Sequence, residues 1–320
     1  MTMVSFTDIF QADKIIRQIR TCIHDAGTEA YTFYTSGVRN HYFYAETICR
    51  IGRDLGSEEV FGKHLKKFKE AEDILGQYDF YFSLSEATSH APECRERFKE
   101  LHGENFARAG EKLHHLLDEE KETKQHSIFL KDCREIEFDK PDKLQKEFGA
   151  FLIKAIQKLN KGWEKGEFNP DEIETGIHEL RRKLRWLSLY AQVSNGLIQL
   201  TGKEEKTEIS KLYVTREILT SPFLQFPKAP EGIRPIEIQF AHFAALSSLI
   251  ATLGELKDAG LALEALNAEE KPLKCLTALP EDYRTLSSIR KEAEKHTRNF
   301  FDRHQIPELI VADIDKSITA

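Results

Sequence analysis

The sequence contains few cysteines, and their positions exclude two common ways of stabilising a fold. The chain of 320 residues has five, Cys22, Cys49, Cys94, Cys133 and Cys275, which are odd in number and form no C-x-x-C pair. A disulfide framework uses an even, patterned set, and a structural zinc site uses closely spaced ligands. The cysteines therefore argue against both, and they favour a protein that works in a reducing compartment.

The sequence also lacks the segments that carry a chain to or across a membrane. The N-terminal stretch "MTMVSFTDIFQADK" has no basic region followed by an apolar core, as a secretion signal would. The longest apolar run, "FAALSSLIATLG", is interrupted by serines and is far shorter than the roughly 20 residues that span a bilayer. We therefore expect a cytoplasmic protein without a membrane partner.

Positive charge is not in excess. The 46 lysines and arginines are outnumbered by 53 aspartates and glutamates, and the net charge is −7. Proteins that bind nucleic acid through their overall field usually carry the opposite sign. The composition therefore argues against a nucleic-acid partner, and any polyanion must be bound by a local basic patch.

Sequence motifs of phosphate-transferring, dinucleotide-binding and serine-hydrolase sites are absent. His24 and Asp25 resemble half of an HD-type metal site, but no histidine precedes them. Glu111 and His114 have the spacing of a di-iron bundle ligand pair, but no second pair has that spacing. The sequence thus predicts no metal and no cofactor, and it favours a binding protein over an enzyme.

Strand patterns are nearly absent, and the dominant period is helical. Only "FYFSL", residues 80–84, is a strand candidate, whereas the apolar positions of segments such as 12–27 recur every three or four residues. Ser57 suits a helix N-cap, and Asn169 followed by Pro170 suits the start of a helix that reaches about Leu200. The four prolines of residues 219–235 predict a loop. The expected class is all-α, with about ten helices.

The densest basic run lies in "GIHELRRKLRWLSLYAQ", residues 176–192. On a helical wheel four of its five basic residues, His178, Arg181, Arg182 and Arg185, fall in one narrow sector, about 130° from an apolar seam. The cationic residues are His178, Arg181, Arg182, Lys183 and Arg185, and the seam contains Ile173, Ile177, Leu180, Leu184, Leu187 and Ala191.

Few acids accompany this cationic sector. Glu174 is the only acid one turn from His178, and Glu179 is expected to point elsewhere. Like charges one turn apart destabilise a helix by a few tenths of a kcal/mol per pair, so an anion or acids of a facing helix should complete the cluster. Arginine forks suit phosphate oxygens. From the spacing alone, a solvated helix face is the simpler interpretation.

The stretch "IHELRRKLR" resembles the signature helix of the CHAD family, the conserved histidine α-helical domains. In that signature a histidine is followed at the third and seventh positions by arginines, here His178, Arg181 and Arg185. A later "LGELKD" resembles the family's L-G-x-x-x-D element through Leu253, Gly254 and Asp258. The motifs cover only residues 176–185 and 253–258.

The resemblance implies two repeated four-helix-bundle-like units of long antiparallel helices. We place the first repeat at residues 1–135 and the second, which carries the His/Arg helix, at 136–320. The first repeat is degenerate, because aligning Arg39 with Arg185 leaves threonines at the positions of His178 and Arg181. "EEKETKQHS", residues 119–127, is the first plausible break.

The resemblance also implies a function, because related domains bind inorganic polyphosphate in a basic groove between helices. The expected ligand is polyphosphate or a similar polyanion, held by His178, Arg181, Arg182, Arg185, Arg39 and Lys66. Such binding should weaken steeply with salt, and also as His178 loses its proton. The alternative is a helical scaffold for a protein partner that has lost the anion site. In that case the basic helix pairs with acids of a neighbouring helix.

Overall fold

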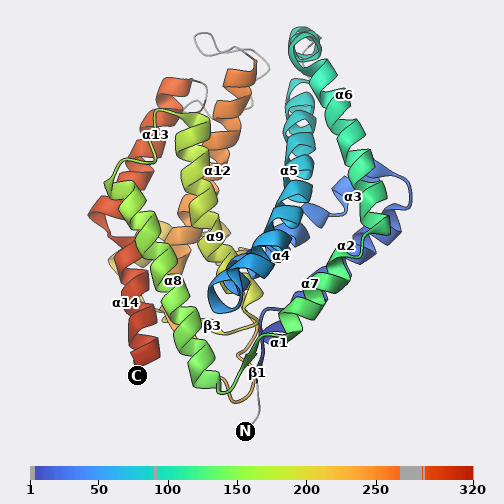
Figure 1. The fold of residues 1–320 in the computed structure, drawn as a ribbon. Helices are drawn as coiled ribbons and strands as arrows, with labels where there is room; N and C mark the ends of the chain where they lie inside the picture. The colour runs from blue at the N-terminus through green and yellow to red at the C-terminus, as the bar shows by residue number, and fades with distance from the viewer. Residues whose placement is uncertain (1–3, 90–91, 267–282, 284, 320) are drawn as a thin grey trace. The chain divides into compact units, whose positions relative to one another are not determined.

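The computed structural model describes residues 4–89, 92–266, 283 and 285–319, and the fold is all-α. The helices α1 to α14 account for most of these residues, and the strands are two to four residues long. The described chain forms two compact units, residues 4–137 and residues 138 onwards, which we call the first and the second unit. Each is described by itself below (Figure 1).

The first unit is built around three helices that are adjacent in sequence. α4 packs along α5, and α5 packs along α6, while α2 and α7 cover the remaining sides (Figure 1). Its core is aromatic and includes Phe6, Tyr42, Phe61, Phe68 and Phe129, all at most 2 % exposed. The elements are β1 (Val4–Ser5), α1 (Phe6–Ile9), α2 (Ala12–Ala26), α3 (Ala30–Thr35), α4 (Val38–Leu55), α5 (Glu58–Thr88), α6 (Pro92–Glu122), α7 (Gln125–Arg134) and β2 (Glu137–Phe138).

Helix α5 begins at the predicted N-cap and includes the residues that were expected to form a strand. The Ser57 side chain accepts a hydrogen bond from the backbone N–H of Val60, as expected for the N-cap, and two glutamates occupy the first turn. The helix then continues through Gly76 to Thr88. The strand expected at residues 80–84 is therefore wrong. Leu84 and Thr88 are buried one turn apart, which is a helical period.

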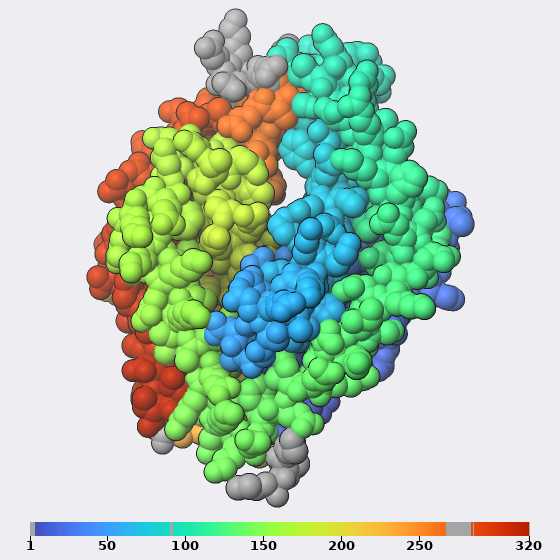
Figure 2. All heavy atoms as spheres, in the orientation of Figure 1, coloured from blue at the N-terminus to red at the C-terminus, as the bar shows by residue number. Residues whose placement is uncertain are grey.

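The second unit is built on the long helices α8, α9 and α12 together with α13 and α14, and it has additional short elements. α8 and α14 lie side by side, and their side chains pack along one edge in the space-filling view (Figure 2). α12 contacts both α9 and α14. The elements are α8 (Pro141–Glu164), η1 (Ile173–His178), α9 (Glu179–Val193), β3 (Ile198–Thr201), α10 (Glu208–Tyr213), α11 (Arg216–Leu219), η2 (Pro222–Leu224), β4 (Ile236–Gln239), α12 (Phe240–Ala265), α13 (Leu286–Arg298), η5 (Asn299–Arg303) and α14 (Ile306–Thr319).

The connection between α9 and α12 differs most from the sequence-based expectation. The helix that should reach Leu200 ends at Val193, because Asn195 and Gly196 adopt positive φ angles of 44° and 85° and turn the chain. β3 follows and pairs in parallel with β4, with Ile198 opposite Ile236. The proline-rich stretch between them is a loop with one short 3₁₀ turn, as predicted. In the first unit, by contrast, α4 is joined to α5 by Gly56 and Ser57 alone.

The start of the basic helix also differs from the sequence-based expectation, which placed it at Asn169 and Pro170. Asn169 caps a turn by accepting from the backbone N–H of Asp171 (3.0 Å), and the helix begins only at Ile173, with one π-helical turn, η1. A Cβ on Gly176 would lie 1.7 Å from the carbonyl oxygen of Asn169. Because Gly176 has no side chain, the backbone of the turn at Asn169 can pack directly against the helix.

The described cysteines include three free thiols and one disulfide-bonded residue. Cys22, Cys49 and Cys133 are buried free thiols, and burial raises the pKa of the Cys49 and Cys133 thiols. Cys94 is disulfide-bonded, which the scattered cysteines did not predict. Cys275 lies outside the described residues. Among the described helices, none combines the length and the apolar character that a membrane span requires.

Candidate anion-binding site

The apolar seam of the basic helix is buried, as predicted. Its side chains from Ile173 to Ala191 are between 0 and 8 % exposed, and they face α12 and α8. Burial of this seam fixes the rotation of η1 and α9, so the cationic residues lie beside the core instead of in it.

Arg182 and Lys183 share one acidic partner on their own helix. The Glu179 carboxylate forms ion pairs with the Arg182 guanidinium (N···O 2.5 Å) and with the Lys183 ammonium (3.1 Å). The expectation that Glu179 points elsewhere is therefore wrong. All three side chains are partly exposed, and the pairs are the i,i+3 and i,i+4 contacts of a solvated face.

His178 is held by the acid one turn before it. Its Nδ1 lies 3.0 Å from a carboxylate oxygen of Glu174. The hydrogen bond to His178 lowers the pKa of Glu174, and the charges of Lys257 and Arg182 add to this effect. Glu174 therefore stays ionised, and Lys257 of α12 belongs to the same electrostatic neighbourhood.

Arg181 lies across a glycine of α12. Its Nε donates to the carbonyl oxygen of Ile250 (3.3 Å), and a Cβ on Gly254 would lie 3.0 Å from the same nitrogen. We call the part of α12 from Ile250 to Lys257, on which Arg181 lies, the second-unit notch. Gly254 belongs to the "LGELKD" element, so the two quoted motifs meet in space. Arg185, one turn further along α9, lies over the Trp186 ring at 5.9 Å.

Lys257 completes the basic surface and was missed by the sequence analysis. It lies three residues after Gly254, is 18 % exposed, and pairs with the more exposed carboxylate of Asp258. The only signal for it was its place inside "LGELKD". Its proximity to Glu174 shows only in the tertiary structure, because η1 packs on α12.

Arg39 of the first unit has the same kind of contact with a glycine. A Cβ on Gly76 of α5 would lie 2.7 Å from its Nη2, which defines the first-unit notch. Here two carboxylates hold the guanidinium. Glu72 accepts from Nε (2.8 Å) and Asp79 accepts from Nη1 (2.6 Å), and the Tyr34 hydroxyl donates to the other Asp79 oxygen (2.5 Å).

In its contact with a glycine, Arg39 resembles Arg181. The alignment of Arg39 with Arg185 stays a prediction. With Arg39 set against Arg181, the buried positions of α4 fall on those of α9. The buried sets are Val38, Tyr42, Ala45 and Cys49 in α4, and Leu180, Leu184, Leu187 and Ala191 in α9.

A second pair of contacts follows the same correspondence. His64 lies twelve residues before Gly76, and His242 lies twelve residues before Gly254. Each histidine pairs with an aspartate of the last helix of its unit, His64 with Asp132 (2.7 Å) and His242 with Asp313 (2.7 Å).

Lys66 lies on the solvated face of α5. Its side chain is 78 % exposed and faces Glu70 at 4.0 Å. Lys63, Lys67 and Lys69 also pair with acids of the same helix. Arg39 and Lys66 belong to the first unit and the basic helix belongs to the second, and the expected groove that joins them stays a prediction.

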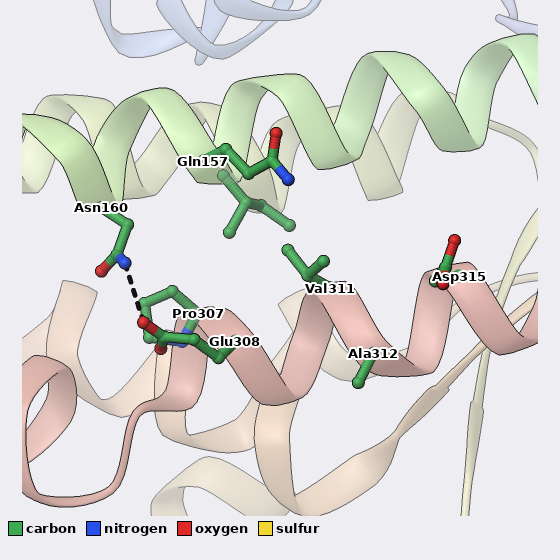
Figure 3. A pocket seen from close by; sticks show the side chains of 8 residues that line it. Gln157, Asn160, Pro307, Glu308, Val311, Ala312 and Asp315 are labelled. Carbon is green, nitrogen blue, oxygen red and sulfur yellow. Dashed lines mark hydrogen bonds between the residues drawn. The ribbon is translucent and has the colours of Figure 1, made fainter.

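A groove of about 230 Å³ lies elsewhere in the second unit, between α8 and α14 (Figure 3). Ile156, Val311 and Ala312 contribute apolar surface, and Asn160 donates to Glu308 (2.8 Å) at one end. None of the residues that line it is basic, so it is no site for an anion. Among the described residues, no group of three or more histidine, cysteine or acidic side chains could hold a metal.

Comparison of the chain with models of protein families, with curated proteins and with solved structures finds no match. The resemblance to CHAD domains therefore rests on the quoted residues.

Proposed function

We propose that the second unit binds a phosphate-rich anion, with inorganic polyphosphate as the expected class. The site consists of His178, Arg181, Arg185 and Lys257, and Arg182 contributes mainly through its charge because Glu179 already pairs with it. The proposal keeps the residues of the signature helix and adds the lysine of α12.

The proposal rests on the different side chains that surround the two glycines, Gly76 in the first-unit notch and Gly254 in the second-unit notch. Arg39 is held by Glu72 and Asp79, whereas the corresponding positions of α12, counted from the glycine, are Ile250 and Lys257. One acid is replaced by a neutral residue and the other by a cation. Over the whole turns, residues 250–258 carry Glu255, Lys257 and Asp258, whereas residues 72–80 carry three acids and no cation, so the second-unit segment is more positive by two charges.

The chemistry of the side chains suits phosphate oxygens. A guanidinium presents a planar fork of donors, and an ammonium supplies a point charge beside it. His178 adds a donor that its partner Glu174 orients. Several such groups on one surface favour a ligand with repeated charges, because each phosphate that is neutralised releases counterions.

We further propose that the two units are copies of one helical unit. The arginine on a glycine, the histidine–aspartate pair twelve residues earlier, and the shared burial of α4 and α9 support this proposal. The connection between α9 and α12 is then an insertion in the second copy.

A role as a protein-interaction scaffold is the second candidate. It is favoured by exposed apolar side chains of the α9–α12 connection, Leu212 (57 %), Leu219 (41 %) and Phe223 (51 %). Surface apolar residues gathered in one segment are typical of interaction sites, although single ones are common on any protein.

The test of anion binding is a fluorescence-anisotropy titration with labelled polyphosphate at two salt concentrations. Wild type should bind, and the affinity should fall steeply at the higher salt concentration. Arg181→Gln/Arg185→Gln should lose at least about tenfold in affinity, because it removes both guanidinium forks.

The matched control is Arg182→Gln/Lys183→Gln, which removes two charges from the same helix but from side chains that already pair with Glu179. It should lose much less affinity. Circular dichroism checks that each variant is folded. Absence of salt-sensitive binding by wild type, or equal losses in the two double variants, would overturn the proposed site and leave the scaffold.

A further inference from the structure

The first-unit notch has the arginine of an anion site but is occupied by carboxylates of its own chain. This inference rests on the proposed function of the second unit. We infer that Glu72 and Asp79 act as internal ligands that exclude an external anion from Arg39. The two acids therefore decide that the chain binds its ligand in one unit and not in both.

The geometry of Arg39 is that of an arginine with a bound oxyanion. Glu72 Oε1 lies 2.8 Å from both Nε and Nη2, and Asp79 Oδ2 lies 2.6 Å from Nη1. These short charge-assisted contacts use the same donors that a phosphate would use. Arg39 is still 29 % exposed, so the notch is open to solvent on one side.

Tyr34 fixes one of these ligands. Its hydroxyl donates to Asp79, and burial together with this contact raises the pKa of Tyr34 well above its usual range. Tyr34 therefore remains a donor under all physiological conditions and keeps the Asp79 carboxylate against Arg39. An external anion would have to displace an oriented, covalently attached competitor, whose effective concentration is high.

Further cations would support an anion once the acids are removed. Arg50 and Lys69 both act on the buried Glu46, which also feels Glu72. The notch region thus holds three cations, and its acids are Glu46, Glu72 and Asp79, with Asp73 paired to Lys69 at the edge. Removal of Glu72 and Asp79 takes two negative charges from this region and leaves it with a positive excess.

The experiment counts anion sites in the full chain. Isothermal titration with a short polyphosphate at low salt should give one site for wild type. Glu72→Ile/Asp79→Lys, which installs the residues found at positions 250 and 257, should give two. The additional change Arg39→Gln should return the count to one.

A conservative variant and a reverse variant keep the test informative if the first variant does not fold. Glu72→Gln/Asp79→Asn removes the two charges with little change in shape and should also gain a site. Its matched control, Glu70→Gln/Asp73→Asn, removes two exposed acids of the same helix and should gain none. In the second unit, Ile250→Glu/Lys257→Asp should abolish binding although Arg181 is retained.

The outcomes separate the inference from the function on which it rests. If wild type binds one equivalent and folded first-unit variants still bind one, the inference is overturned while the proposed function stands. Retained binding in the reverse variant also overturns it. If wild type binds nothing but the first-unit variants gain a site, the proposed function fails and the exclusion by Glu72 and Asp79 stands.

Discussion

Glu46 is a carboxyl group that the fold has taken out of water. It is 2 % exposed on α4, and its partner Arg50 lies 3.4 Å away. Burial raises the pKa of Glu46 to about 7, because the desolvation of the charged form outweighs the attraction of Arg50, and Glu72 adds repulsion. The folded protein therefore holds a proton on Glu46 at a pH at which the unfolded chain has released it.

This proton has a predictable effect on stability. Between the ordinary glutamate pKa, near 4.5, and about 7, the folded state binds one more proton than the unfolded state, so the free energy of unfolding falls as pH rises. Above pH 7 the loss is complete. Glu46→Gln, which cannot ionise, should raise the free energy of unfolding by about 1–3 kcal/mol at pH 8 and change it little at pH 4.5.

Urea denaturation of wild type and Glu46→Gln across this pH range is the measurement. The difference between the two proteins should grow between pH 4.5 and 7 and then level off. A difference that does not depend on pH would mean that Glu46 is charged in the folded protein throughout the range.

At the same scale, the neighbours of an arginine decide what it can bind. Arg39 and Arg181 each lie against a glycine; Arg39 pairs with two carboxylates, and Arg181 donates to the carbonyl oxygen of Ile250. The residue type by itself therefore does not identify an anion site.

At the scale of the element, the entry into the basic helix depends on Gly176. The turn at Asn169 presses its backbone against this glycine, and the close approach coincides with the π-helical turn η1. π-turns are uncommon and often lie near functional sites. Here the turn carries Glu174 and His178 to the end of α9, next to α12.

Gly176→Ala should destabilise the protein, because a Cβ would meet backbone atoms that cannot rotate away. We expect a loss of about 1–3 kcal/mol, typical of overpacking, together with weaker anion binding as His178 shifts. Thermal denaturation and the anisotropy titration measure the two effects.

The control for this variant is Gly103→Ala in α6. A Cβ on Gly103 has no heavy atom within 4 Å, and alanine is the better helix former. It should leave stability unchanged or raise it by up to about 1 kcal/mol. If both variants behave alike, the contact between Gly176 and Asn169 does not shape the helix entry.

At the scale of the whole molecule, each unit has its own histidine–aspartate pair between two helices. His64 joins α5 to α7, with Gln125 on its other nitrogen, and His242 joins α12 to α14. Asp313 also accepts from the backbone N–H of Gln239 (2.9 Å), so this pair fixes the start of α12 as well.

Removal of either histidine should loosen its own unit more than the other. His64→Ala should raise amide hydrogen exchange mainly in α5 and α7, and His242→Ala mainly in α12 and α14, because each change leaves a partly buried aspartate without its partner. Hydrogen-exchange mass spectrometry reads both units in one sample. A uniform rise along the chain after either substitution would contradict the division into two units.

Much of this fold was predictable, because long helices depend on local periodicity. The buried stripe of residues 12–26, the cap at Ser57 and the proline-rich loop all follow from neighbouring residues alone. The wrong expectations concern positions where contacts distant in sequence outweigh local signals. The turn at Gly196 ends a helix whose apolar pattern continues, and residues 80–84 are helical because α5 continues along α6.

By itself, the sequence determined the helical class, the buried seam of the basic helix and the cations beside it, because periodicity and side-chain type suffice for these. Only the tertiary structure decided which cations share a surface and which are neutralised. Arg39 of α4 pairs with Glu72 and Asp79 of α5, and Lys257 of α12 lies near Glu174 of η1. Charge pairing between helices depends on packing, and no local pattern in the sequence specifies it.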